Sequence, residues 1–253
     1  DLHSFPTRRS SDLDLNRHET NPENGRTVSC AEMLRDAELM KRYNIDTVRT
    51  SHYPNHRLWY DICDRYGIYV MSEANVESHG MRYGADCMPE RKEWHATMVE
   101  RNVRQVYFYR NSPSVVMWSV GNEIYDMHAD KRGTTVTRFL ADQVRIHDPE
   151  RHAAVTFGCN YMPWEGGQRC AEYVDAVGYN YGEKLYEEHH REHPAWVIYG
   201  SETASLRHRN NAHGRNSTIH KRHSTTAECD QQDVTKITQP SMSIDSATTS
   251  PCI

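Results

Sequence analysis

The chain has 253 residues, 37% of them apolar, and carries 35 acidic against 30 basic side chains, for a net charge near −5. That length fits one large barrel domain or two smaller domains, and the mixed, mildly acidic charge argues against a nucleic-acid partner. No stretch approaches the roughly 20 consecutive apolar residues of a membrane-spanning helix, and the seven cysteines, without a C-x-x-C pair, predict neither a disulfide framework nor a structural zinc site.

The two ends of the chain differ in composition from its middle. Residues 3–13 match the forward translation of a common sequencing-library adapter, so residues 1–13 are interpreted as an adapter-like artefact. Residues 206–253 contain no aromatic side chain and show neither a helical nor a strand period. Because such a segment buries too little apolar surface to offset its ordering entropy, it is predicted to be a low-complexity tail, disordered or frameshifted. One domain is therefore expected, at residues 14–205.

Between these ends, predicted strands and helices alternate. Strands are predicted at 15–18, 45–50, 68–75, 114–121, 153–157, 176–181 and 197–201. Helices are predicted at 31–44, 57–66, 91–110, 136–147 and 183–193. Ser29 and Glu32 have the spacing of a capping box before the first helix, and Gly67 follows the second helix where a left-handed residue is favoured.

The predicted strands are continuously apolar rather than alternating, which is typical of a parallel sheet covered by helices. No G-x-G-x-x-G or P-loop follows a strand, which argues against a doubly wound nucleotide-binding sheet. Polar residues gather where the strands end, as they do in the active sites of β/α barrels. The sequence therefore predicts an α/β fold, an incomplete (β/α)8 TIM barrel with about seven recognisable strands and the eighth missing.

Two glutamates stand at the ends of the fourth and seventh predicted strands. Glu123 follows Gly121 and Asn122, and Glu202 follows the strand at 197–201. Glycoside hydrolysis needs such a pair, one carboxylic acid to protonate the leaving oxygen and one carboxylate to attack the anomeric carbon. A single strand-end glutamate is more often the partner of an arginine, so only the pair indicates this chemistry.

Longer segments of the chain resemble the barrel domain of family 2 glycoside hydrolases, most of all the large β-galactosidases. The resemblance covers roughly residues 14–205 and is carried by residues 16–19, 36–56, 63–67, 73–81 and 118–123. The ending from Gly200 to Ser205 resembles a branch common in gut-type bacteria and differs from the Cys-Glu-Tyr-Ala-His segment of the best-known members. The resemblance implies a retaining β-galactosidase, with Glu123 as general acid/base and Glu202 as nucleophile.

The resemblance also implies substrate-binding residues. Asn122 matches the residue that hydrogen-bonds the sugar 2-hydroxyl, and Tyr181 matches a tyrosine that orients the nucleophile. His18 and His52 match two histidines that contact the galactosyl unit. From the residues alone, each histidine is also compatible with an ordinary strand-end or core histidine.

A magnesium cofactor is implied in the same way, with Glu77, His79 and Glu123 as its protein ligands. The i, i+2 spacing of Glu77 and His79 puts both side chains on one side of an extended segment, although spacing alone favours a salt-bridged loop. The Glu- and His-rich run at 187–193 lacks an H-E-x-x-H pattern and is predicted to be a solvated helix face.

Family members continue past the nucleophile and carry jelly-roll and immunoglobulin-like domains before the barrel. None of these is recognisable, so we expect this chain by itself to have little or no activity. Three alternatives stay open: a β-glucuronidase or β-mannosidase, a metal-dependent amidohydrolase barrel, and a non-catalytic carbohydrate-binding remnant. A carbohydrate substrate, no membrane partner and a homo-oligomeric parent are expected; the compartment, bacterial cytoplasm or periplasm, stays undetermined.

Overall fold

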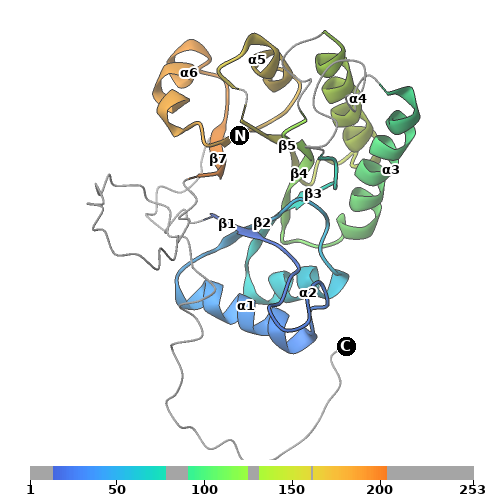
Figure 1. The fold of residues 1–253 in the computed structure, drawn as a ribbon, viewed down its shortest axis with the longest axis vertical. Helices are drawn as coiled ribbons and strands as arrows, with labels where there is room; N and C mark the ends of the chain where they lie inside the picture. The colour runs from blue at the N-terminus through green and yellow to red at the C-terminus, as the bar shows by residue number, and fades with distance from the viewer. Residues whose placement is uncertain (1–13, 78–90, 125–130, 161, 204–253) are drawn as a thin grey trace, which may run out of the picture. The chain divides into compact units, whose positions relative to one another are not determined.

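The computed structural model describes residues 14–77, 91–124, 131–160 and 162–203. In this part of the chain, seven strands form one parallel sheet in which each strand pairs with the next along the sequence. The helices lie around the outside of the strands (Figure 1). The prediction of an incomplete TIM barrel is therefore confirmed. The segments interpreted as an artefact (1–13) and as a tail (206–253) lie outside the described residues.

All seven predicted strands are present, with ends that differ by a few residues at most. The strands are β1 Asp14–Arg17, β2 Thr47–Thr50, β3 Tyr69–Glu73, β4 Val115–Asn122, β5 Ala154–Cys159, β6 Val177–Asn180 and β7 Ile198–Glu202. Their alternation turns apolar side chains such as Val48 and Val70 toward the helices and polar ones such as Arg49 into the barrel.

The helices are α1 Cys30–Arg42, α2 Arg57–Tyr66, α3 Lys92–Tyr109, α4 Lys131–His147, α5 Glu165–Ala171 and α6 Tyr186–Glu192, with a 3-10 turn η4 at Glu183–Leu185. The capping box of Ser29 and Glu32 is confirmed, and Gly67 ends α2 in the left-handed conformation with φ of 63°. Helix α5 was not predicted. Two adjacent glycines lower its helix propensity, but Gly167 and Cys170 are buried, so tertiary packing stabilises it.

The hydrophobic core lies between the sheet and the helices. Trp118 and Phe157 from the strands and Trp59 and Leu140 from the helices are almost completely buried. The Trp118 indole Nε1–H donates to Asp148 Oδ2 over 2.9 Å, which ties β4 to the end of α4. Buried polar groups of this kind need a partner, because an unpaired one would cost free energy on leaving water.

The prediction of a solvated face at 187–193 is wrong for one residue. His189 is only 3% exposed, and its Nδ1 lies 2.8 Å from the hydroxyl oxygen of Tyr179 on β6. The short helix α6 turns this histidine inward, which the charge pattern of the segment did not reveal.

The first and last strands are linked by side chains rather than by a strand ladder in the described residues. The Asn16 Nδ2–H of β1 donates to the carbonyl oxygen of Ser201 on β7 over 3.0 Å. Arg49 Nη1 donates to the same carbonyl over 3.2 Å. The first bond joins the two edge strands across the nearly closed barrel, and the second joins β2 to β7.

Other findings on this part of the chain agree with the composition. Cysteines 30, 63, 159 and 170 are free thiols. None of the helices in the described ranges combines the length and the apolar character required to cross a bilayer.

The close approach of β6 to its neighbours generates a stability prediction. A methyl group at Gly178 would lie 2.7 Å from the Phe157 carbonyl oxygen and 2.6 Å from Ser201 Oγ. Since the carbonyl belongs to the backbone and cannot rotate away, Gly178→Ala should lower the free energy of unfolding by about 1–3 kcal/mol. Urea denaturation measures this change.

Gly200→Ala is the matched control for this prediction. Its methyl group would meet Thr203 Cγ2 and Tyr186 Oη, both at 2.7 Å, and both atoms are ends of side chains that can rotate. Gly200→Ala should therefore destabilise the protein less than Gly178→Ala. The opposite ranking would contradict the packing described for β6.

Candidate active site

The carboxyl ends of β4, β6 and β7 bring the predicted site residues to one edge of the barrel. Asn122 ends β4 and Glu202 ends β7, while Glu123 and Tyr181 directly follow β4 and β6. Glu123 and Tyr181 have left-handed backbone conformations, with φ of 43° and 55°, which are uncommon for residues that carry a side chain. The chain turns sharply at these two points, where Glu123 contacts Asn180 of β6 and Tyr181 contacts Glu202.

A buried ion pair occupies the barrel interior at this edge. Arg49 Nε lies 2.9 Å from Glu73 Oε2, and Arg49 Nη2 lies 3.2 Å from Glu73 Oε1. The two side chains are 1% and 0% exposed. Burial would raise the pKa of Glu73, but the charges of Arg49 and His52 outweigh burial, so the pKa of this carboxyl is lowered. Both groups are therefore charged in the dry interior.

Arg49 also connects the ends of three other strands. Its Nη1 donates to Glu202 Oε1 over 3.0 Å and to Asn16 Oδ1 over 3.1 Å. Its Nη2 donates to Asn122 Oδ1 over 2.6 Å. A guanidinium group is planar and carries five N–H donors in fixed directions. One side chain on β2 therefore sets the positions of groups on β1, β3, β4 and β7.

Glu202 is held at both of its carboxylate oxygens. Oε1 accepts from Arg49, and Oε2 accepts from the Tyr181 hydroxyl over 2.7 Å. Burial, the hydrogen bond to Glu202 and the charges of Glu202 and Glu123 raise the pKa of Tyr181 well above its usual value. Tyr181 thus remains a hydrogen-bond donor to Glu202.

Two amides connect the end of β4 to the end of β6. The Asn180 Nδ2 group donates to Asn122 Oδ1 over 3.0 Å and to Glu123 Oε1 over 2.8 Å. Gly158 of β5 leaves room for this contact, because a methyl group there would lie 2.6 Å from Asn122 Oδ1 and 2.8 Å from Arg49 Nη2. A continuous chain of hydrogen bonds therefore runs from Glu202 through Arg49, Asn122 and Asn180 to Glu123.

The two predicted sugar-binding histidines are neighbours. The ring centroids of His18 and His52 are 5.6 Å apart, and His52 Nδ1 lies 2.7 Å from Glu73 Oε1. Burial lowers the pKa of His52, but the hydrogen bond and charge of Glu73 outweigh it, so the net shift is upward. Burial and the charge of His52 lower the pKa of His18. The pKa values of the two neighbouring rings are thus shifted in opposite directions.

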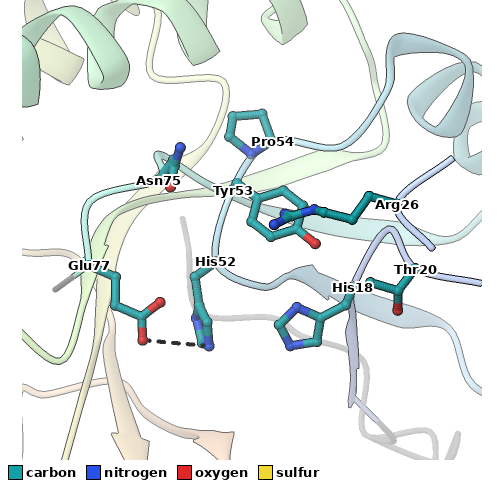
Figure 2. Close-up of a pocket in the computed structure, with 8 residues that line it drawn as sticks. All are labelled: His18, Thr20, Arg26, His52, Tyr53, Pro54, Asn75 and Glu77. Carbon is teal, nitrogen blue, oxygen red and sulfur yellow. Dashed lines mark ion pairs between the residues drawn. The ribbon is translucent and has the colours of Figure 1, made fainter. Parts of the chain in front are cut away.

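A cavity of about 650 Å³ opens beside these histidines (Figure 2). It is lined by His18, Thr20, Arg26, His52, Tyr53, Pro54, Asn75 and Glu77. Neither predicted catalytic glutamate lines it, but His52 connects the cavity to the site: its Nε2 lies 3.7 Å from Glu202 Oε1 and 3.9 Å from Glu77 Oε1. The volume is in the range of pockets that hold a small ligand.

Two of the three predicted metal ligands, Glu77 and Glu123, lie within the described residues. Glu77 Oε1 accepts from Asn122 Nδ2 over 3.2 Å, so Glu77 and Glu123 contact the two linked amides. Both supply the hard oxygen ligands that magnesium prefers. His79 lies outside the described residues, and the described residues alone contain no group of three or more His, Cys, Asp or Glu arranged to hold a metal ion.

The structure brings His18, His52, Asn122, Glu123, Tyr181 and Glu202 to one edge of the barrel, and their catalytic and substrate-binding roles stay predictions. Of the residues that connect them, Arg49 and Glu73 were not predicted, whereas Asn180 belongs to the polar residues expected at the strand ends. Arg49 and Glu73 had a signal, since each is a charged residue within a strand of a sheet that is buried on both faces. Asn180 had the signal of a polar residue at the end of a predicted strand, but a strand-end asparagine is equally compatible with a turn, so no role was assigned to it.

The chain matches known proteins over the same residues. A family model described as glycosyl hydrolases family 2, TIM barrel domain, matches residues 14–213. The β-galactosidase of Yersinia enterocolitica is 36% identical over 184 residues, which are 73% of this chain and 16% of that protein. The chain spans between 10% and 16% of the length of such curated relatives.

Solved structures agree with the fold. A glycosyl hydrolase family 2 member from Bacteroides cellulosilyticus superimposes with a TM-score of 0.67 at 27% identity, covering 76% of this chain and 24% of that one. A β-glucuronidase from Ruminococcus gnavus, in complex with uronic isofagomine, gives a TM-score of 0.62 at 20% identity, covering 76% of this chain and 36% of that one. At 20% identity, the similarity to the β-glucuronidase supports a shared fold and does not indicate a shared function.

The buried ion pair generates the prediction for this site. Glu73→Gln removes one charge of the pair and leaves Arg49 buried with Glu202 as its remaining carboxylate. Breaking a buried pair in this way should lower the free energy of unfolding by about 3–5 kcal/mol. Urea denaturation at pH 7 measures the loss. Glu100→Gln is the control, because its ion pair with Arg104 is exposed and should change stability by less than about 1 kcal/mol.

The pH dependence of this difference provides a second check. Because the folded protein lowers the pKa of Glu73 from its ordinary value of 4.5, the stabilisation is present above that value and is lost as the pH falls through the lowered pKa. The gap between the native protein and Glu73→Gln should therefore shrink in acid. A gap that is constant from pH 7 into the acid range would contradict a charged Glu73.

Proposed function

This chain belongs to glycosyl hydrolase family 2 and supplies the TIM-barrel domain of a glycoside hydrolase, and we propose that its enzyme is a retaining β-galactosidase that acts on terminal, non-reducing β-D-galactosides. The observation that carries the proposal is the hydrogen-bonded chain that links Glu202 to Glu123 across the ends of β7 and β4. The activity is proposed for the whole enzyme, since the curated relatives are six to ten times longer than the part that this chain matches.

In this mechanism Glu202 is the nucleophile. Its two oxygens are fixed by Arg49 and Tyr181, so attack on the anomeric carbon needs little reorientation of the carboxylate. A new bond forms between a Glu202 oxygen and the anomeric carbon while the bond from that carbon to the aglycone oxygen breaks. The product is a covalent galactosyl-enzyme and a free aglycone.

Glu123 is the general acid/base. In the first step its carboxylic proton passes to the departing aglycone oxygen, and in the second step its carboxylate takes a proton from water. That water attacks the anomeric carbon and releases Glu202, so the sugar leaves with its original configuration. The contact with Asn180 supports this role, because it fixes one carboxylate oxygen at the end of β4.

The substrate contacts follow from the same edge of the barrel. Asn122 would hydrogen-bond the sugar 2-hydroxyl, a contact that strengthens as charge develops in the transition state. His18 and His52 would contact the galactosyl ring from the cavity wall. The galactose assignment is supported by relatives called β-galactosidases. The alternative function within the same family is a β-glucuronidase or a β-mannosidase. The alternative without catalysis is a remnant that binds carbohydrate and does not hydrolyse it.

Magnesium is part of the proposal. Glu77 and Glu123, with His79, would hold the ion, and when bound it would supply a fixed positive charge beside the acid/base. The hard carboxylate oxygens of Glu77 and Glu123 fit such an ion, and one imidazole in the ligand set is acceptable.

The roles of the two glutamates can be assigned by chemistry. The test uses the longest open reading frame at the source locus that contains residues 14–203, recovered by long-read sequencing. With a dinitrophenyl β-galactoside and sodium azide, Glu202→Ala should release α-galactosyl azide, because azide enters from the side that the carboxylate occupied. Glu123→Ala should release β-galactosyl azide, because azide displaces Glu202 from the covalent intermediate. Proton NMR distinguishes the two anomers.

Substrates with poor and good leaving groups should respond differently to Glu123→Ala. On lactose, whose leaving group needs protonation, Glu123→Ala should lower kcat/KM by about 10²–10⁴-fold, and on the dinitrophenyl substrate by much less. Glu100→Ala, on the outer helix α3, should change neither rate. The same azide anomer from both variants would refute the assigned roles, and turnover of glucuronides or mannosides but not galactosides would refute the galactose assignment.

Magnesium binding is predicted to depend on Glu77. Dialysis against EDTA should lower activity, and readdition of Mg²⁺ should restore it. Glu77→Gln should raise the Mg²⁺ concentration for half-maximal activity by at least about tenfold, because removal of a direct ligand costs no less than removal of an outer-shell partner. Glu100→Gln is the matched control. An unchanged requirement in Glu77→Gln would remove Glu77 from the ligand set.

A further inference from the structure

The cavity in Figure 2 has two chemically different ends, and the proposed reaction uses only one of them. At one end Glu77 faces His52, whose Nε2 also lies 3.7 Å from Glu202 Oε1. The other end, which we call the Arg26 end, consists of Thr20, Arg26 and Tyr53. His18 stands between the two ends.

Distances between the rings give the order of these groups. His18 lies 5.6 Å from His52 and 6.1 Å from Tyr53, measured between ring centroids. The guanidinium carbon of Arg26 lies 4.8 Å from the centre of the Tyr53 ring. Figure 2 shows the Arg26 side chain reaching over the Tyr53 ring, while Glu77 lies beside His52. A ligand that reaches from Glu202 past His18 would therefore meet Arg26.

Arg26 has a positive charge that no carboxylate in the described part of the chain neutralises. Among hydrogen bonds, ion pairs and ring contacts, Arg26 makes one within the described residues, the approach of its guanidinium group to the Tyr53 ring. Stacking on an aromatic face holds the plane of a guanidinium group and leaves its N–H edges available. Arg26 is an exposed residue that lines the cavity.

Tyr53 is itself held in place, so the stacked arginine has an ordered support. The Tyr53 hydroxyl oxygen accepts from the backbone N–H of Glu19 over 3.1 Å. The backbone N–H of Tyr53 donates to the carbonyl oxygen of Thr50 over 3.1 Å, at the end of β2. An arginine positioned in advance loses less entropy when it binds a ligand.

The donors at the Arg26 end indicate the chemistry of the ligand. A guanidinium group donates only, whereas a sugar hydroxyl both donates and accepts. A sulfate ester or a carboxylate only accepts, carries the opposite charge and suits the fork of an arginine. At the other end, Glu77 and Glu202 would repel such a group. An anion is therefore favoured beside Arg26 and disfavoured beside the reacting bond.

We propose that Arg26, stacked on Tyr53, binds an anionic substituent, a sulfate ester or a carboxylate, on the sugar unit that the enzyme releases. The inference rests on the proposed function, because it takes His18 and His52 as contacts of the galactosyl unit. Both histidines line the cavity, and His52 Nε2 lies 3.7 Å from an oxygen of Glu202, the proposed nucleophile. The volume of about 650 Å³ leaves room for a substituted sugar.

The test compares neutral and charged substrates on the same full reading frame. The substrates are 4-nitrophenyl β-D-galactoside, its 3-O-sulfate and 6-O-sulfate, and 4-nitrophenyl β-D-galacturonide. The variants are Arg26→Gln, which removes the charge, and Arg26→Lys, which keeps the charge but loses the fork. Arg42→Gln, at the exposed end of α1, is the matched control.

One pattern of rates is expected. Arg26→Gln should lower kcat/KM about tenfold to a hundredfold for the sulfate ester or galacturonide that the native enzyme prefers, the size expected for a lost charged hydrogen bond. It should change the neutral galactoside less than twofold. Arg26→Lys should lie between, Arg42→Gln should match the native enzyme, and 1 M salt should reduce the dependence on Arg26. Which charged substrate responds distinguishes a sulfate from a carboxylate.

Two results would overturn the proposal and leave the proposed function intact. One is hydrolysis of the neutral galactoside with no charged substrate that depends on Arg26. The other is an equal loss on neutral and charged substrates in Arg26→Gln, which would make Arg26 a ligand of neutral hydroxyls. If the enzyme hydrolysed neither the neutral nor the sulfated galactosides, the proposed function would instead be overturned. If it then still hydrolysed the galacturonide, and more slowly in Arg26→Gln, that result would support the anion site by itself.

Discussion

Arg49 and Glu73 are two opposite charges that the barrel interior removes almost completely from water, and the ends of the strands are arranged around them. Transfer of both charges into a dry interior is favourable only if nearly every donor and acceptor finds a partner. Arg49 meets this condition by donating to groups from β1, β3, β4 and β7. Glu73 meets it through Arg49, His52 and Ser119. The need to satisfy one buried pair thus fixes the relative positions of strands that are far apart in the sequence.

The same requirement also positions the carboxylates of the proposed nucleophile and acid/base. Glu202 is held by a cation on one oxygen and by a phenol on the other, whereas the Glu123 carboxylate accepts from an amide. Two carboxyl groups in different surroundings have different pKa values, so one can act as a nucleophile and the other as an acid/base. Because their supports belong to one connected network, a change at Arg49 or Asn122 is expected to affect both groups, and the effects of paired substitutions should not be additive.

Small residues make this network possible. Gly158 has no side chain where Arg49, Asn122 and Asn180 meet, and Gly178 lets β6 lie close to Phe157 and Ser201. Packing on the outer face has the opposite character, with large apolar side chains such as Trp118 and Trp59 against the helices. The barrel therefore separates two tasks by face: apolar burial outside the sheet stabilises the fold, and polar contacts inside it position the site.

The sequence by itself determined the elements and the type of chemistry. Some features are local signals and could be recognised without a structure: the continuous apolar strands, the amphipathic helices, the cap at Ser29 and the helix end at Gly67. The pair of strand-end glutamates was legible for the same reason. Tertiary structure decided the rest: α5 forms despite its glycines, His189 turns inward to Tyr179, and Arg49 connects to Glu202. These features depend on contacts between residues distant in the chain, such as the 153 positions that separate Arg49 from Glu202, and no local pattern encodes which buried charge will meet which partner when the barrel brings its strand ends together.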